Sequence, residues 1–234
     1  MRTRVTSLLP SLVGLTLGMR HALEPDHLAA VSTLASSERG GTAASLKLGL
    51  FWGLGHTLSL TLVGGTLAFF GAHMPARLEQ GFEFLVAVMV VGLGLRAVAK
   101  AIAEGREGAA HSHAHGQVSH THVAPPAHLH LSQWTLATRP LLIGVLHGLA
   151  GSGALTTMVL LELPTTAARL SYIALFGAGS IAGMALLTGL AGAPLMRLAR
   201  VPRVASALLL VTGLVSTGIG AWWGVTSARL LLGA

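Results

Sequence analysis

Five ionisable side chains lie close together in an otherwise apolar part of this sequence. Residues 18–34 read GMRHALEPDHLAAVSTL, and eight consecutive positions hold Arg20, His21, Glu24, Asp26 and His27. An ionisable group inside a membrane costs several kcal/mol unless it faces a cavity or binds a partner. Imidazole nitrogens suit Ni²⁺, Co²⁺, Cu²⁺ and Zn²⁺. The sequence contains no cysteine, which excludes disulfides and thiolate ligands, so we predict a metal site built from nitrogen and oxygen donors.

The spacing of these ligands requires a break in the helix that carries them. An ideal helix advances about 100° per residue, so His21 would point about 140° away from Asp26 and about 120° away from His27. Pro25 removes a backbone donor and clashes with the preceding turn, and it disfavours the helical conformation of Glu24. Proline is also favoured as the first residue of a helix. We therefore predict a first transmembrane helix that is interrupted near Pro25, with the unwound backbone lining a cavity.

A fourth ligand is expected from the next apolar segment. His56 lies in the stretch FWGLGHTLSL, where Gly53 and Gly55 permit close packing against another helix. Three other interpretations of the charged stretch stay open. It could be a loop at the membrane surface, a salt-bridge cluster such as Arg20 with Glu24 at helical spacing, or a proton relay.

The composition is that of a polytopic membrane protein. Of 234 residues, 52% are hydrophobic and 10% are charged, and the mean hydropathy is +0.70. A soluble domain usually carries about 25% charged residues. The net charge of +7 lies at the edges of apolar runs, which is typical of charge that orients membrane segments and not of a nucleic-acid surface. We expect the apolar N-terminus to act as an uncleaved signal anchor.

Six apolar segments predict an all-α fold with six transmembrane helices. They cover residues 8–34, 47–72, 82–103, 139–161, 167–191 and 204–226. The expected organisation is a first three-helix repeat that carries the metal motif, residues 1–103, then a histidine-rich loop, 104–138, and a second three-helix repeat, 139–234.

The two halves resemble each other weakly in sequence. GMRHALEPDHLAAVS aligns with GVLHGLAGSGALTTM, which pairs Gly18 with Gly144 and His21 with His147. Farther along, residues 53–56 align with residues 177–180. Because each repeat would hold an odd number of helices, the second would enter the membrane from the opposite side. Such inverted repeats are common among transporters, which bind their substrate near the repeat interface.

The loop between the halves is rich in histidine and has two adjacent prolines. It is interpreted either as a flexible linker or as a low-affinity metal buffer formed by His111, His113, His115, His120, His122, His128 and His130. Lys and Arg are more numerous on the side of the membrane that carries this loop, nine against five on the side of the N-terminus. The loop is therefore expected to face the cytoplasm.

The chain resembles the nickel/cobalt transporter superfamily at two motifs. One family signature is His, four residues, then Asp-His, which residues 21–27 match. The other is Leu-Gly-His followed by Ser or Thr, which residues 54–57 match. The resemblance implies a proton-coupled or gradient-driven permease that transports nickel or cobalt without an organic cofactor. It also implies four metal ligands: His21, Asp26, His27 and His56.

Some features differ from the larger members of that family. Those members have more transmembrane helices than six, and their acidic residue three positions after the first histidine is usually Asp, where this chain has Glu24. Their second-half Gly-Phe-Asp-Thr core is replaced by LHGLAGSGALTTM. These features are similar to the shorter urease- and hydrogenase-accessory branch. Glu24 and His147 are secondary ligand candidates, and His147 either compensates for the missing Asp or only packs.

The leading hypothesis is a permease for divalent transition-metal ions in a prokaryotic plasma membrane. Its expected partners are the lipid bilayer, the metal ion and a cytoplasmic metallochaperone, with no nucleic acid. A second hypothesis is a membrane-bound delivery or assembly factor for a metalloenzyme. A third is an intramembrane serine protease using Ser152 near His147, which is disfavoured because Ala150 replaces the first glycine of the Gly-x-Ser-Gly motif. The chain is not expected to be an enzyme.

Overall fold

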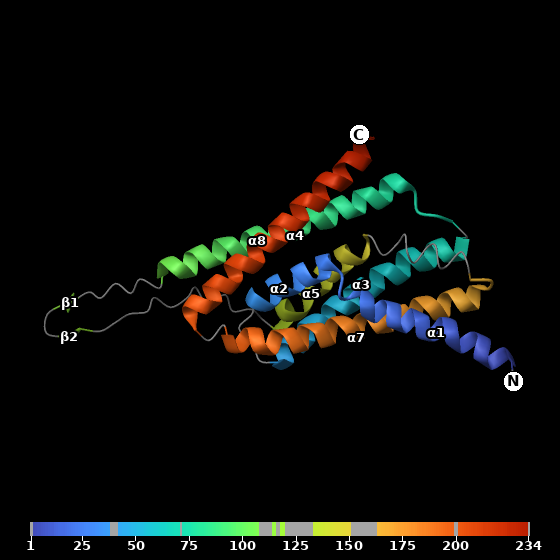
Figure 1. Ribbon diagram of the computed structural model, residues 1–234, viewed down its shortest axis with the longest axis horizontal. Helices are drawn as coiled ribbons and strands as arrows, with labels where there is room; N and C mark the ends of the chain where they lie inside the picture. Colours follow the sequence, from blue (N-terminus) through green and yellow to red (C-terminus); the bar gives the residue numbers. More distant parts are fainter. Residues whose placement is uncertain are drawn as a thin grey trace.

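The protein is a bundle of long helices, seen from the side in Figure 1. The computed structural model describes residues 2–37, 42–70, 72–107, 114–115, 118–119, 133–150, 163–198 and 201–233. The described helices are α1 (Arg2–His21), α2 (Pro25–Ser37), α3 (Thr42–Phe70), α4 (Ala76–Glu107), α5 (Gln133–Gly148), α7 (Thr166–Leu198) and α8 (Pro202–Leu232). A short antiparallel pair of strands, β1 (Ala114–His115) and β2 (Val118–Ser119), lies between α4 and α5 in the sequence. The expected helical fold is confirmed for these residues.

Four of the described helices are long and apolar enough to cross a membrane. The spans are Thr42–Leu67, Ala76–Ala103, Thr166–Ala191 and Arg203–Leu232. The sequence predicted six spans. Among the remaining described helices, α2 and α5 have only 13 and 16 residues, and α1, with 20 residues and three arginines, is not one of the four spans. About 20 apolar residues are needed to cross the hydrocarbon core.

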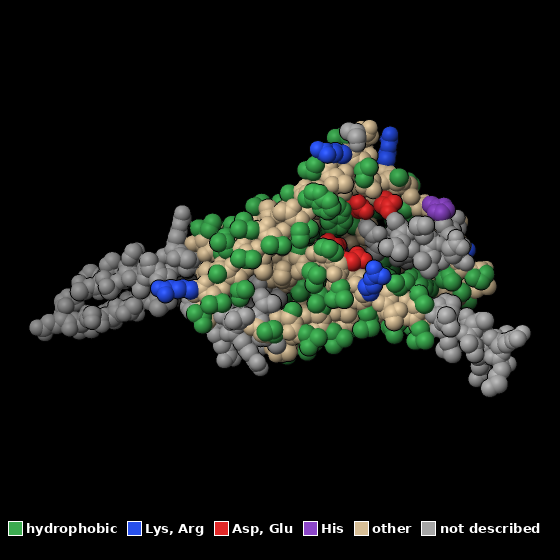
Figure 2. Space-filling model, viewed as in Figure 1, with side chains coloured by type: hydrophobic (Ala, Val, Ile, Leu, Met, Phe, Trp, Pro, Cys, Tyr) green, Lys and Arg blue, Asp and Glu red, His purple; other side chains and the backbone are tan. Residues whose placement is uncertain are grey.

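The outer faces of these helices are apolar. Large side chains such as Leu62, Phe69 and Leu190 are exposed, and hydrophobic side chains are spread over the surface in Figure 2. Buried polar side chains, among them Ser180, Thr188 and Ser216, lie between the helices. Apolar groups outside and polar groups inside are the distribution expected when lipid is the solvent.

Glycines bring the helices of the two halves into backbone contact. A Cβ atom at Gly18 of α1 would overlap the backbone of Phe176 and Ser180 on α7. A Cβ atom at Gly144 of α5 would overlap the backbone of Trp52 and His56 on α3. Helix α1 of the first half therefore packs against α7 of the second half, and α5 of the second half packs against α3 of the first half. The glycines at these two contacts, Gly18 and Gly144, are paired in the sequence alignment.

The reverse contacts are made by a second pair of glycines. Gly55 of α3 lies against Leu141 and Val145 of α5, and Gly179 of α7 lies against Leu15 and Met19 of α1. Each of these crossings therefore has a glycine on both helices, which is the packing that small residues allow in membranes. The outermost described helices, α4 and α8, pack along each other at one side of the bundle (Figure 1).

Candidate metal centre

The chain breaks between α1 and α2 in the middle of the bundle. Helix α1 ends at His21, and the amides of Leu23 and Glu24 donate to the carbonyls of Arg20 and His21, at 2.9 and 3.1 Å. Helix α2 then begins at Pro25. This arrangement confirms the interruption predicted from Pro25. It also lets the side chains on the two sides of the break face the same space, which an unbroken helix would not.

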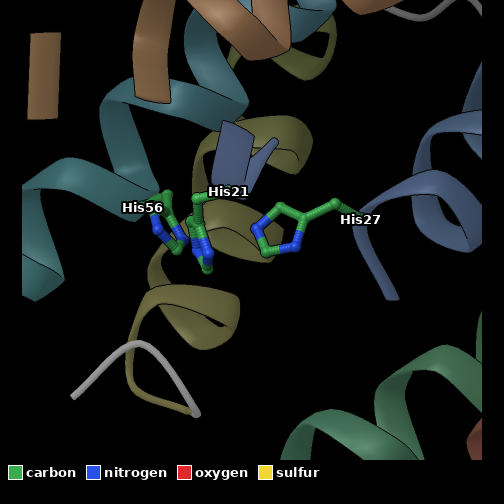
Figure 3. A group of neighbouring side chains, drawn as sticks. All are labelled: His21, His27 and His56. Carbon is green, nitrogen blue, oxygen red and sulfur yellow. The ribbon is translucent and has the colours of Figure 1, made fainter. Parts of the chain in front are cut away.

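Three histidines from three helices meet at this break. His21 comes from α1, His27 from α2 and His56 from α3, and Figure 3 shows their rings side by side. The ring centroids are 4.5 Å apart for His21 and His27, 5.0 Å for His21 and His56, and 5.3 Å for His27 and His56. One nitrogen from each ring lies within 4.8 Å of the others, so small side-chain rotations would let one ion contact all three.

Most nitrogens of this cluster have no protein partner. His21 is 7% exposed, and His27 and His56 are each 1% exposed. Nε2 of His21 and both ring nitrogens of His27 and His56 make no hydrogen bond within the described part of the chain. A buried polar atom without a partner costs about 1–3 kcal/mol. The cluster is therefore poorly explained as a set of packed core histidines.

Asp26 faces a different group from the one that the sequence predicted. Its Oδ2 lies 2.6 Å from Nε2 of His147 on α5, and its Oδ1 lies 3.1 Å from Nδ1 of His27 without hydrogen-bond geometry. Asp26, His27 and His147 form a second group of three possible ligands within 4.8 Å. His27 belongs to both groups, so the four expected ligands are close together but do not form a single ring around one point.

Glu24 lies at the edge of the centre. Its Oε1 is 3.0 Å from Nδ1 of His21, and its side chain is 46% exposed. Among the described residues its carboxylate pairs with His21 and not with Arg20, so the salt bridge considered from helical spacing is not formed. A carboxylate on one imidazole nitrogen fixes which nitrogen is free to bind a metal. Glu24 is therefore placed to orient His21, whose Nε2 makes no hydrogen bond within the described chain.

A cavity of about 300 Å³ opens at the helix break. It is lined by His21, Glu24, Pro25, Asp26, His27, Ala150, Ile219, Trp222 and Trp223. Figure 2 shows acidic side chains on either side of a hollow in the face of the molecule. The break therefore lines a cavity, as the sequence predicted for unwound backbone at this position, and two of the clustered histidines, His21 and His27, line the same cavity.

A relative of this chain shares most of its length. The chain is 34% identical over 208 residues to the urease accessory protein UreH of Bacillus sp. (strain TB-90), which covers 89% of this chain and 87% of the relative. The chain belongs to the urease-accessory branch of the nickel/cobalt transporter superfamily. This membership confirms the family indicated by the two motifs. No family model and no solved structure matches the chain.

Two aromatic residues pack against these histidines, and the motifs predicted neither of them. Trp52 stacks on His27 at 5.4 Å between centroids and meets His147 edge-on at 5.7 Å. Phe176 of α7 lies 5.5 Å from His21. The sequence could have predicted the place of Trp52, because Trp52 precedes His56 by four residues on the same helix and therefore lies on the same face.

Helix α8 also contributes a wall that the motifs did not predict. Trp222 and Trp223 line the cavity, and Nε1 of Trp223 donates to Oε2 of Glu83 on α4 at 3.4 Å. The hydroxyl of Ser227 donates to the same oxygen at 3.3 Å. Glu83, a carboxylate within a predicted span, thus has two donors from α8 and ties the two outer helices together.

Several predicted residues lie outside this centre. Of the loop histidines, His115 is the last residue of β1. The others lie outside the described residues: His111, His113, His120, His122, His128 and His130. Ser152, the residue on which the protease hypothesis rests, also lies outside them. His147, which the sequence left undecided between ligand and packing residue, belongs to the centre through Asp26.

Proposed function

We propose that the protein is a membrane permease for divalent transition-metal ions, nickel or cobalt above all, which binds the ion at the intramembrane histidine and aspartate centre. The observation that carries the proposal is the convergence of four buried histidines, most of whose ring nitrogens make no hydrogen bond. Six ring nitrogens of His21, His27, His56 and His147 lack a hydrogen bond within the described chain, and of these six Nδ1 of His27 lies 3.1 Å from a carboxylate oxygen of Asp26. At about 1–3 kcal/mol each, their cost compares with the whole stability of a typical domain, about 5–15 kcal/mol. A bound ion would give one nitrogen of each ligating ring a partner.

The donor set supports this choice of ion. Imidazole nitrogens with one carboxylate suit Ni²⁺, Co²⁺, Cu²⁺ and Zn²⁺ better than Mg²⁺ or Ca²⁺, which prefer oxygen. Membership of the nickel/cobalt transporter superfamily favours the first two. A helix interrupted at a cavity in the membrane is the usual form of a transporter's binding site.

The proposal includes six spans in two inverted three-helix repeats, residues 1–103 and 139–234, joined by the loop 104–138. The paired glycine contacts support it. The contact of Gly18 with helix α7 corresponds to that of Gly144 with helix α3, and the contact of Gly179 with helix α1 corresponds to that of Gly55 with helix α5. In this arrangement α1 and α2 form one interrupted span, and α5 begins the fourth. Helix α5 supports that view because Leu149 and Ala150 donate to the carbonyls of residues 146 and 147, as residues 23 and 24 do after α1.

The proposed location is a prokaryotic plasma membrane, with the histidine-rich loop in the cytoplasm. There the loop histidines would act as a low-affinity buffer that passes ions to or from a cytoplasmic metallochaperone. No catalytic step is part of this proposal.

A second function has an observation in its favour. The relative is named an accessory protein of urease, which fits a factor that binds metal for delivery to an enzyme without moving it across the membrane. Both functions use the same ligands. They differ in whether the ion crosses the bilayer.

Uptake by reconstituted liposomes separates the two functions. We expect Ni²⁺ or Co²⁺ to enter liposomes that contain the wild-type protein. Liposomes that contain the His27→Ala variant should take up neither ion. Ser180→Ala, a buried change on α7 outside the ligand groups, is the matched control and should transport normally. Metal binding without entry would favour the delivery factor, and unimpaired entry with His27→Ala would remove this site from the mechanism.

A further inference from the structure

The centre contains two overlapping groups of ligands, and their arrangement carries an inference about how the ion moves. The first group is His21, His27 and His56, and the second is Asp26, His27 and His147. We propose that the two groups are alternative positions for a single ion, that His27 serves both, and that His147 is the ligand that makes the second position. The translocation in this inference rests on the proposed permease function.

The two positions are built from different parts of the molecule. The first uses α1, α2 and α3, all from the first half of the chain, and the second brings in α5 from the second half. The ring of His27 lies between them, 4.5 Å from that of His21 and 4.2 Å from that of His147. The rings of His56 and His147 are 6.3 Å apart, the widest of these separations. An ion can therefore exchange His21 and His56 for Asp26 and His147 while it stays on His27.

The shared ligand makes the two positions mutually exclusive. A neutral imidazole offers one lone pair to a metal, because its second nitrogen carries a proton. Two divalent cations in adjacent buried positions would also repel each other strongly at the low effective dielectric constant of the interior. One ion per centre is therefore expected, distributed over two positions.

The two groups of ligands are similar enough in chemistry for one ion to move from the first position to the second. Three imidazoles form the first position, and two imidazoles with one carboxylate form the second; both sets suit a borderline ion such as Ni²⁺ or Co²⁺. The carboxylate of Asp26 already contacts His147, so these two ligands are held together before an ion arrives. The cavity touches both groups, through His21 in the first and Asp26 in the second.

The test measures Co²⁺ binding by purified full-length protein in which the seven loop histidines are changed to serine, so that the loop adds no imidazole. The variants are His56→Ala, which removes only the first position, His147→Ala, which removes only the second, the double variant, and His27→Ala. Equilibrium dialysis gives affinity and stoichiometry, and X-ray absorption gives the ligand types. Ser180→Ala is the control, and His56→Asn and His147→Asn replace any alanine variant that does not fold.

We expect one Co²⁺ per chain, and an affinity within about tenfold of the parent for His56→Ala and for His147→Ala, because the remaining position still holds the ion. The double variant and His27→Ala should lose more than about a hundredfold. The X-ray absorption spectrum of Co²⁺ bound to the His56→Ala protein should show a carboxylate oxygen among the ligands. The spectrum of Co²⁺ bound to the His147→Ala protein should show imidazole as its only protein ligand. Loss of Co²⁺ binding in His56→Ala or in His147→Ala, or two ions per chain, would overturn the proposal.

Failure of this inference can be told from failure of the permease function. If the variants follow the expected pattern but the wild-type protein carries no ion into liposomes, the two positions stand and the permease does not. If transport occurs but a substitution at His56 or at His147 alone abolishes binding, the permease stands and the alternative positions do not.

Discussion

At the scale of single residues, the state of each imidazole nitrogen decides what the centre can bind. His21 has Glu24 at 3.0 Å from Nδ1 and leaves Nε2 without a partner in the described structure. His56 has neither nitrogen paired there and relies on packing alone for its orientation. A histidine with a carboxylate on its far nitrogen is a better fixed ligand than one without. His21 is therefore the better oriented of these two candidate ligands, although it lies at a helix end.

Glu24 should act on metal affinity through His21. We predict that Glu24→Ala weakens Ni²⁺ binding about 10- to 100-fold, the usual effect of losing a group that orients a ligand. Glu24→Gln should lose less, because its amide oxygen still accepts from Nδ1–H. Titration calorimetry on the purified proteins would measure both affinities. Equal losses in the two variants would mean that the negative charge matters and not the orientation of His21.

At the scale of elements, glycines set how closely the helices approach and hence how closely the histidines do. Gly144 of α5 lies on the backbone of Trp52 and His56, so the contact positions a ligand and the aromatic ring beside it together. Gly18 makes the equivalent contact between α1 and α7, close to His21. These crossings leave no room for a side chain, so the helix pairs and the metal centre are fixed by the same residues.

Gly144→Ala should destabilise the protein and disturb the centre. The added methyl group would force α5 away from α3, and overpacking of this kind costs about 1–3 kcal/mol. Gly65→Ala on α3 is the matched control, because a Cβ atom there meets nothing within 4 Å; it should be neutral or slightly stabilising, as expected for removing a glycine from a helix. Thermal unfolding in detergent would compare them. Equal stability of the two variants would contradict the contact.

Pro25 is the element-scale feature that the sequence located correctly. A proline after a charged turn predicted a helix end near residue 24, and α2 does begin at Pro25. The local rule succeeded because proline acts on its own backbone and on the residue before it. Pro140, inside α5, shows the limit of that rule: it lies in the helix without ending it.

At the scale of the whole molecule, the chain alternates direction through the bundle. The connection between α3 and α4, residues 72–75, lies at the opposite end of the bundle from the start of α8 (Figure 1). Four helices are spans by length and composition, and the proposal adds α1–α2 and α5 as two more. With these six spans, the N-terminus and residues 72–75 would lie on the same side of the membrane. The histidine-rich loop and Val201 would share the other.

Cysteine labelling tests this orientation, and the natural chain contains no cysteine to interfere. We predict that His73→Cys reacts with a membrane-impermeant maleimide in intact cells, because residue 73 is exposed and the proposed orientation places it on the side away from the cytoplasm. Val201→Cys, which is also exposed, should react only after the membrane is opened. Labelling of both residues from the same side would contradict the proposed six spans.

The sequence by itself determined which side chains could bind a metal, the absence of thiolates, the membrane composition and the place of the helix break. These depend on residue type or on neighbours a few positions apart. The tertiary structure decided which of the candidate ligands lie together. Asp26 contacts His147, 121 positions away, instead of His21 and His56. Trp52, Phe176 and the wall from α8 likewise entered the centre only through packing. Such contacts depend on the angle and depth at which helices cross, and glycine contacts between distant segments set those quantities.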